Sequence, residues 1–167
     1  MAGYGTDQGF TDWLAGQGLA LPIGAPTAAV LRQVGSDYVD AAYEHRLACS
    51  HRAGGYQQER AWPRTGHRQG RNDVPDDLIP PAWVNASYRA GYLQATQPGW
   101  ATGAVDPGRI TKREKADVIE REFFGPDVMA AGDAAPGIRA DAVVNGLVLP
   151  WLCAAGRRSP DTLFRVI

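Results

Sequence analysis

Apolar residues recur at helical spacing near the start of the chain. Thr6 is a capping residue type, and Phe10, Trp13 and Leu14 follow it on one helical face. Gly16 is expected to end this short helix, because glycine is a poor helix former. The residues before Thr6 are small, and we expect them to be flexible.

The longest apolar stripe predicts a helix over roughly residues 26–49, with Pro26 in its first turn. Gly35 interrupts the stripe and allows another helix to approach closely. The stripe consists of Val30, Leu31, Val34, Tyr38, Val39, Ala42 and Leu47. The charged residues off the stripe are expected to be solvated, namely Asp37, Asp40, Glu44 and Arg46.

Two further helical patterns lie in the second half of the chain. One covers 81–96, with the large anchor Trp83 and several small residues that favour tight helix packing. The other covers 138–155, where Pro150 must kink or split the helix.

Within residues 109–124 the residue pattern changes from helical spacing to an alternation of every second residue. This predicts two short charged strands joined near Ala116 as a hairpin. Lys112, Arg113 and Lys115 would face Glu120 and Glu122. A continuous helix is the competing interpretation. An isolated hairpin is marginally stable in water, so we expect it to lean on the helices or on a neighbouring subunit.

These patterns predict a mainly α protein: a small helical bundle with long loops, a short charged β-hairpin and an extended C-terminal arm. The predicted helical domain covers 1–155, and the arm covers 156–167. The arm ends in apolar residues that are expected to pair with another chain, namely Leu163, Phe164, Val166 and Ile167.

The stretch from Arg60 to Gly66 joins the two main helices and reads as an ordered corner. Pro63 favours an extended Trp62, and Gly66 permits a turn. Trp62 is expected to fill the core at this corner.

Residues 51–71 are locally basic, with five arginines against a single glutamate. One interpretation is a solvated loop whose charges are partly cancelled by the aspartates that follow. The other is a basic surface that docks on an acidic protein face or on DNA phosphates. The candidate partner-binding arginines are Arg60, Arg64, Arg68 and Arg71.

The whole chain has a formal net charge of -1, which gives no global basic bias toward nucleic acid. Cys49 and Cys153 are far apart and lack metal-ligand spacing, so free buried thiols in a reducing compartment are expected. The histidines, including His67, are interpreted as polar surface residues, and no metal site, cofactor or catalytic motif is expected. No signal peptide or membrane span is predicted.

The order of motifs resembles the head–tail connector (adaptor) proteins of tailed bacteriophages and related gene-transfer particles, over roughly residues 6–155. The resemblance is carried by AWPRTG (61–66), then VPDDLIPPAW (74–83) leading into an alanine-rich helix, then a charged KRE…IE segment (112–120). Some relatives in this family bear the label DnaT-like single-stranded-DNA-binding protein.

The resemblance implies a structural virion protein, not an enzyme. It implies a ring, usually of twelve subunits, seated on the portal protein in the neck and continuing the channel for packaged DNA. Its partners would be further copies of itself, the portal, and a stopper or tail terminator protein. The expected location is the virion neck, and the host cytoplasm during assembly.

A second hypothesis is a single-stranded nucleic-acid-binding protein that uses the basic 51–71 stretch. Tyr56 and Trp62 would then be its stacking groups.

Overall fold

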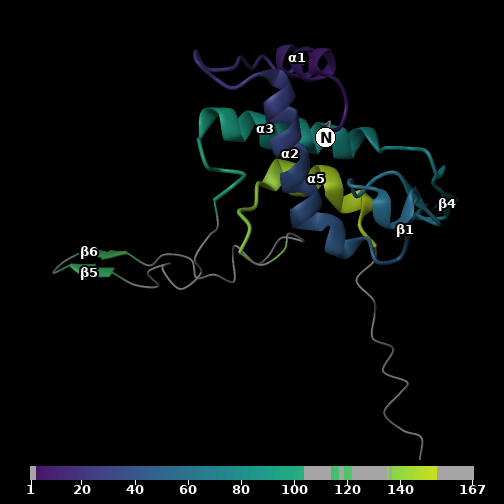
Figure 1. The fold of residues 1–167 in the computed structure, drawn as a ribbon. Helices are drawn as coiled ribbons and strands as arrows, with labels where there is room; N and C mark the ends of the chain where they lie inside the picture. Colours follow the sequence, from purple (N-terminus) through teal and green to yellow (C-terminus); the bar gives the residue numbers. More distant parts are fainter. Residues whose placement is uncertain (1–2, 104–113, 117–118, 122–134, 136, 154–167) are drawn as a thin grey trace, which may run out of the picture.

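The structure is a computed structural model that describes residues 3–103, 114–116, 119–121, 135 and 137–153 (Figure 1). The first helix, α1 (Asp7–Gly16), begins where the sequence predicts, because the Thr6 hydroxyl accepts a hydrogen bond from the Gly9 N–H at 2.9 Å. Not all of the residues before Thr6 are flexible. Tyr4 is 3 % exposed, which corrects the expectation of a flexible start.

The second helix is shorter than the predicted 26–49. It is α2 (Ala28–Tyr43), and a 3-10 turn, η1 (Glu44–Arg46), follows it. The helix ends at Tyr43 because residues just after it form hydrogen bonds to arginines outside the helix. The Leu47 carbonyl accepts from Arg64, and the Glu44 carboxylate accepts from Arg52.

The third helix, α3 (Pro81–Thr96), has the predicted bounds, with Pro81 in its first turn. It crosses α2 (Figure 1). The two glycines at the crossing, Gly35 and Gly91, let the backbones meet, which confirms the role expected for Gly35.

The predicted 138–155 helix is also shorter in the structure. α5 (Ala142–Val148) starts at Asp141, whose carboxylate accepts from two backbone N–H groups at 3.0 Å. At Pro150 the chain continues as a 3-10 turn, η4 (Leu149–Trp151), as expected from a proline that splits the helix. α5 packs on α3, and Arg89 pairs with Asp141 at 3.4 Å.

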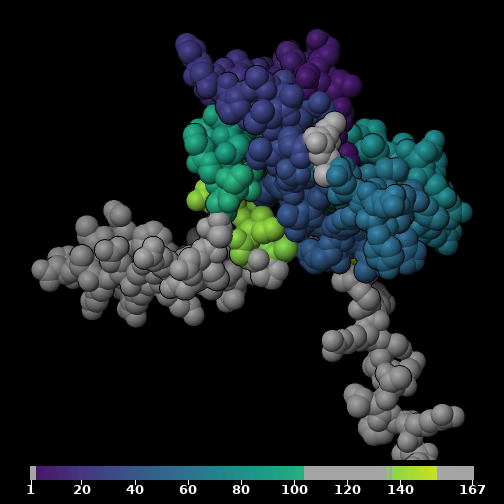
Figure 2. Space-filling view, viewed as in Figure 1, coloured from purple at the N-terminus to yellow at the C-terminus, as the bar shows by residue number. Residues whose placement is uncertain are grey.

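Three two-stranded antiparallel sheets complete the described elements. β1 (His51–Arg52) pairs with β2 (Arg64–Thr65), and β3 (Arg68–Gln69) pairs with β4 (Asn72–Asp73). A short 3-10 turn, η2 (Gly55–Gln57), lies between β1 and β2. The predicted basic loop is therefore a folded lobe of residues 51–73, which stands beside α2 in Figure 2.

The hairpin predicted within 109–124 is confirmed where the structure describes it. β5 (Glu114–Ala116) pairs antiparallel with β6 (Ile119–Arg121), and the register sets Lys115 opposite Glu120. The competing helix is wrong for these residues. Figure 1 draws this hairpin apart from the helices.

Two hydrophobic clusters hold the helices together, which gives a small, mainly α body with minor sheets. One surrounds Trp62 and Trp83, and the other joins α1 to α2 and α3 through Phe10, Leu31 and Tyr88. Within the described ranges, no helix combines the length and apolar character needed to cross a bilayer.

Candidate functional site

The corner at Trp62 is built around its buried indole, as the sequence predicts. Trp62 is 1 % exposed and makes edge contacts with the rings of Trp83 and Trp151, at centroid distances of 6.0 and 5.9 Å. The Trp62–Pro63 peptide is cis, and Gly66 has a φ of 72°, in the left-handed region that favours glycine. Trp62 and Trp83, which is fully buried, are therefore structural anchors.

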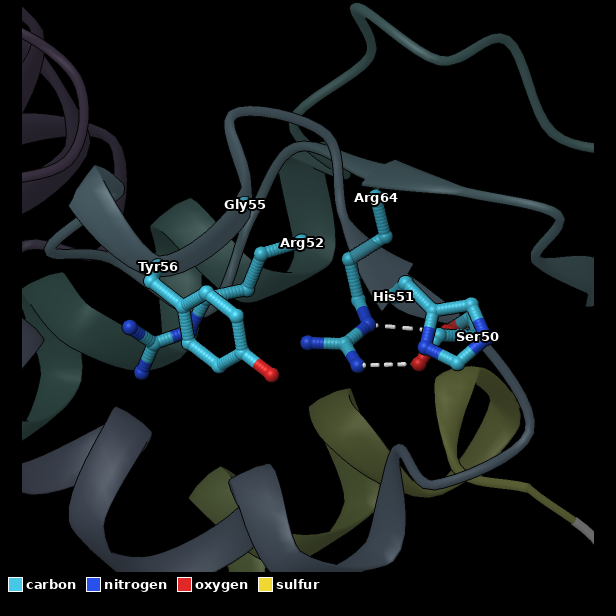
Figure 3. Close-up of a pocket in the computed structure, with 6 residues that line it drawn as sticks. All are labelled: Ser50, His51, Arg52, Gly55, Tyr56 and Arg64. Carbon is cyan, nitrogen blue, oxygen red and sulfur yellow. Dashed lines mark hydrogen bonds between the residues drawn. The ribbon is translucent and has the colours of Figure 1, made fainter.

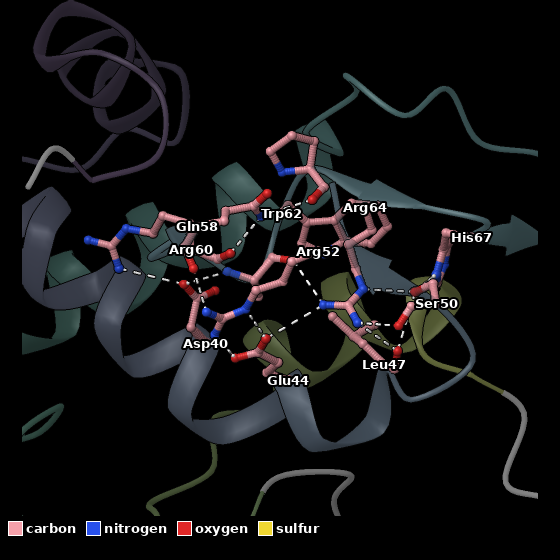
Figure 4. A network of polar contacts seen from close by, with 12 residues as sticks. Asp40, Glu44, Leu47, Ser50, Arg52, Gln58, Arg60, Trp62, Arg64 and His67 are labelled. Carbon is pink, nitrogen blue, oxygen red and sulfur yellow. Dashed lines mark hydrogen bonds and ion pairs between the residues drawn. The ribbon is translucent and has the colours of Figure 1, made fainter. Parts of the chain in front are cut away.

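Arg64 lies inside the corner and not on its surface (Figure 4). It is 5 % exposed, and its guanidinium donates to the carbonyls of Leu47 and Ala61 at 3.0 Å and to the Ser50 hydroxyl at 2.8 Å. Burial lowers the pKa of Arg64, and the Glu44 carboxylate 3.5 Å away partly offsets this effect. Arg64 therefore stabilises the turn after α2. This corrects the sequence-based prediction that Arg64 contacts a partner.

Arg60 also turns inward. Its side chain is 11 % exposed and pairs with Asp37 at 2.7 Å and Asp40 at 3.6 Å on α2. It stands over the ring of Tyr4, 5.6 Å from its centroid. Arg60 therefore docks the corner onto α2.

The other two candidate arginines remain on the surface. Arg68 pairs with Asp73 across the β3–β4 ribbon at 2.8 Å, and both side chains are exposed. Arg71 is also exposed, at the tip of the same ribbon. The candidate contacts of the C-terminal arm, Leu163, Phe164, Val166 and Ile167, fall outside the described residues.

Asp40 forms a buried polar centre that the sequence pattern missed. It was expected in solvent, yet it is 9 % exposed and accepts from the Tyr4 hydroxyl at 2.8 Å, the Trp83 indole at 3.1 Å and the Ala61 N–H at 3.2 Å. Burial raises the pKa of Asp40, and these hydrogen bonds oppose the rise. Burial beside Asp40 also raises the pKa of Tyr4. No local sequence signal marks this centre, because its partners come from distant segments.

A pocket of about 460 Å³ opens on the outer side of the corner (Figure 3). Tyr56, on η2, lies at this pocket with its side chain fully exposed. Arg52 also lines it and is held by the Glu44 carboxylate through two hydrogen bonds of 2.6 Å. These hydrogen bonds raise the pKa of Arg52. The remaining lining residues are Ser50, His51, Gly55 and Arg64.

The two cysteines are joined, which corrects the expectation of free thiols. Cys49 and Cys153 form a disulfide across 104 residues of sequence, with Cα atoms 5.8 Å apart. The expectation of surface histidines is also wrong for His67, which is 1 % exposed and packs against Trp62 with a centroid distance of 4.7 Å.

Comparison with known proteins gives a family for the chain. A family model described as "Putative DnaT-like ssDNA binding protein" matches residues 3–163. No curated protein matches, and no solved structure matches. The match spans nearly the whole chain, including the corner, the helices and the hairpin. The chain therefore belongs to this DnaT-like family.

Proposed function

We propose that this chain is a structural adaptor of the phage neck, which forms a ring on the portal, connects capsid to tail and continues the DNA channel. The order of motifs in the sequence supports this role. The corner also supports it, because its tryptophan and two of its arginines, Arg60 and Arg64, stabilise the fold.

The β5–β6 hairpin is the observation that carries the proposal. Its strands pair with each other, and Figure 1 draws them apart from the helical body. A two-stranded hairpin is marginal in water without a packing surface. We infer that a neighbouring subunit supplies that surface. One such contact, repeated with a rotation that closes, generates a ring.

The exposed β3–β4 ribbon offers a second contact. Arg68 and Arg71 present positive charge there, suited to an acidic face of the portal or of the next neck protein. The apolar residues 163–167 remain the predicted third contact.

The test is assembly on the portal. The full chain is mixed with purified portal rings and examined by native mass spectrometry and by cryo-EM class averages. A ring of this chain on the portal is expected, and a chain that stays monomeric with portal present would overturn the proposal.

Variants locate the contacts. Lys115→Glu reverses a charge in the hairpin and should impair ring formation without lowering the melting temperature. Arg139→Glu makes the same charge change at an exposed position outside the hairpin and is the matched control. Deleting residues 163–167 should spare the monomer and impair assembly.

Single-stranded DNA binding is the second candidate, favoured by the family description and by Tyr56 beside the arginine-lined pocket. Trp62 is buried and cannot stack on a base, so Tyr56 is the stacking group this hypothesis retains.

The DNA hypothesis predicts oligonucleotide binding that weakens steeply with salt. Tyr56→Ala should weaken it by about tenfold, whereas Tyr56→Phe keeps the ring and the affinity. Fluorescence anisotropy over a salt series measures both. An affinity that does not depend on salt, or that is unchanged in Tyr56→Ala, argues against this candidate. Neither result bears on the adaptor proposal.

A further inference from the structure

Cys49, His67 and Cys153 meet at one point from three separate segments. Cys49 lies in the turn after η1, His67 lies between β2 and β3, and Cys153 follows η4. Their ligand atoms, two sulfurs and an imidazole nitrogen, all lie within 4.8 Å of one another. Two thiolates and an imidazole are a donor set typical of zinc sites.

His67 is held in a position suited to a metal ligand. Its Nδ1 points to Cys49 Sγ at 4.0 Å, and the buried ring is fixed against Trp62. Around a tetrahedral zinc, bonds of about 2.3 Å to sulfur and about 2.0 Å to nitrogen place those two atoms about 3.5 Å apart. A small shift therefore brings the ring into coordination distance.

The hydrogen bonds around Ser50 allow the ligand nitrogen of His67 to change its partner. Nδ1 faces the Ser50 hydroxyl at 3.0 Å, but that hydroxyl has a second acceptor in the Leu47 carbonyl at 3.3 Å. Metal binding at Nδ1 would thus leave Ser50 with a partner.

The surroundings of the two cysteines also suit metal binding. The Cys49 N–H donates to Cys153 Sγ at 3.0 Å, and the Cys153 N–H donates to the Arg46 carbonyl at 3.0 Å. Backbone N–H groups that point at sulfur stabilise a thiolate. Cys49 is exposed and Cys153 is half-buried, so a reductant and an ion can reach both.

We propose that the reduced chain binds one Zn²⁺ through Cys49 Sγ, Cys153 Sγ and His67 Nδ1, with water as the fourth ligand. Reduction uses two molecules of a small thiol. These become a disulfide, while the Cys49–Cys153 bond breaks and each sulfur gains a hydrogen. Zinc then displaces the two thiol protons, which are released to solvent.

Both forms link Cys153 to the turn after η1. The disulfide makes this link under oxidising conditions, and zinc makes it where thiols stay reduced. The site thus fixes Cys153 to the turn after η1 in either redox state.

The experiment compares the full chain in its two redox states. The protein is reduced with a phosphine, freed of reductant under argon, and titrated with Zn²⁺ or with Co²⁺ as a coloured probe. We expect one metal per reduced chain by native mass spectrometry, with thiolate-to-cobalt charge-transfer absorption. The oxidised wild type should bind no metal. This control tests whether binding needs the free thiols of the two cysteines, without any substitution.

Substitutions test each ligand. Cys49→Ser should abolish the thiolate–cobalt signal or reduce it to that of a single sulfur, and His67→Asn should weaken zinc affinity by at least about tenfold. His51→Asn, at an exposed histidine in the neighbouring strand, should bind zinc as the wild type does. A reduced wild-type chain that takes up no metal, or equal uptake by the oxidised and reduced chains, would overturn the proposal.

Discussion

Gly35 of α2 and Gly91 of α3 face each other where the two helices cross. A Cβ on Gly35 would lie 2.0 Å from the Ser87 carbonyl oxygen and 2.7 Å from the Gly91 nitrogen, and a Cβ on Gly91 would lie 2.6 Å from the Leu31 carbonyl oxygen. Backbone stands against backbone here, so no side chain can move aside. The crossing sets the distance between the two helices that carry the Trp62 corner.

Gly35→Ala should therefore destabilise the protein by about 3 kcal/mol, at the upper end for overpacking, because the clash is with backbone. Urea unfolding followed by circular dichroism measures it. Gly146→Ala is the matched control. It also lies within a helix but has open space around its Cβ position, and it should be neutral or stabilising by up to about 1 kcal/mol. Equal effects of the two changes would contradict the crossing geometry.

Replacing Trp62 by alanine should lower the unfolding free energy by about 3–5 kcal/mol, because the indole is buried among three other rings. Chemical denaturation gives the value. Trp62→Phe should cost less, since it keeps an aromatic ring. If Trp62→Ala melts like the wild type but fails to assemble, Trp62 is an interface residue and its assignment as an anchor is wrong.

Two arginines of the corner lobe should differ sharply on truncation. Arg64→Ala removes the side-chain donor to the Ser50 and Ala61 carbonyls and one of the donors to the Leu47 carbonyl, and should destabilise by about 3–5 kcal/mol. Arg68→Ala removes the exposed pair with Asp73 and an exposed hydrogen bond to the Arg71 carbonyl, and should change stability by less than about 1 kcal/mol. Thermal melting in parallel compares them, and similar losses would show that Arg64 is not the internal support of the turn.

Stability should depend on pH through Asp40. Its pKa is raised in the folded protein above the ordinary value of 3.8, so the folded chain holds the proton more tightly than the unfolded chain. The contribution of Asp40 is then fully present below about pH 4 and is lost as the pH rises through the folded pKa.

The Asp40→Asn variant lacks this titration. The unfolding free energy of wild type minus that of Asp40→Asn should therefore fall as the pH is raised from about 3.5 toward 7. Urea denaturation at several pH values, with the two proteins side by side, gives this difference. A difference that stays constant or grows with pH would mean that the hydrogen bonds to Asp40 outweigh its burial.

How far the sequence predicts the fold is clearest at the helices. Thr6, Pro81 and the apolar stripes fix where α1 and α3 lie, because caps and helical periodicity are local properties of a few neighbouring residues. The β5–β6 hairpin follows in the same way from its alternating charges. The end of α2 at Tyr43 cannot be predicted in this way, since it depends on hydrogen bonds from arginines in the 51–73 lobe, which is distant in the sequence.

The sequence by itself thus determined the helical class, the small-residue crossing and the burial of Trp62. Tertiary structure alone decided that Arg64, Asp40 and His67 are internal and that Cys49 meets Cys153. A buried polar or charged side chain is tolerated only where partners compensate its lost hydration. Apart from the Ala61 carbonyl, three residues from Arg64, the hydrogen-bond partners named above for these three side chains lie at least 14 residues away, and the disulfide joins cysteines 104 residues apart. No local pattern records contacts at that separation.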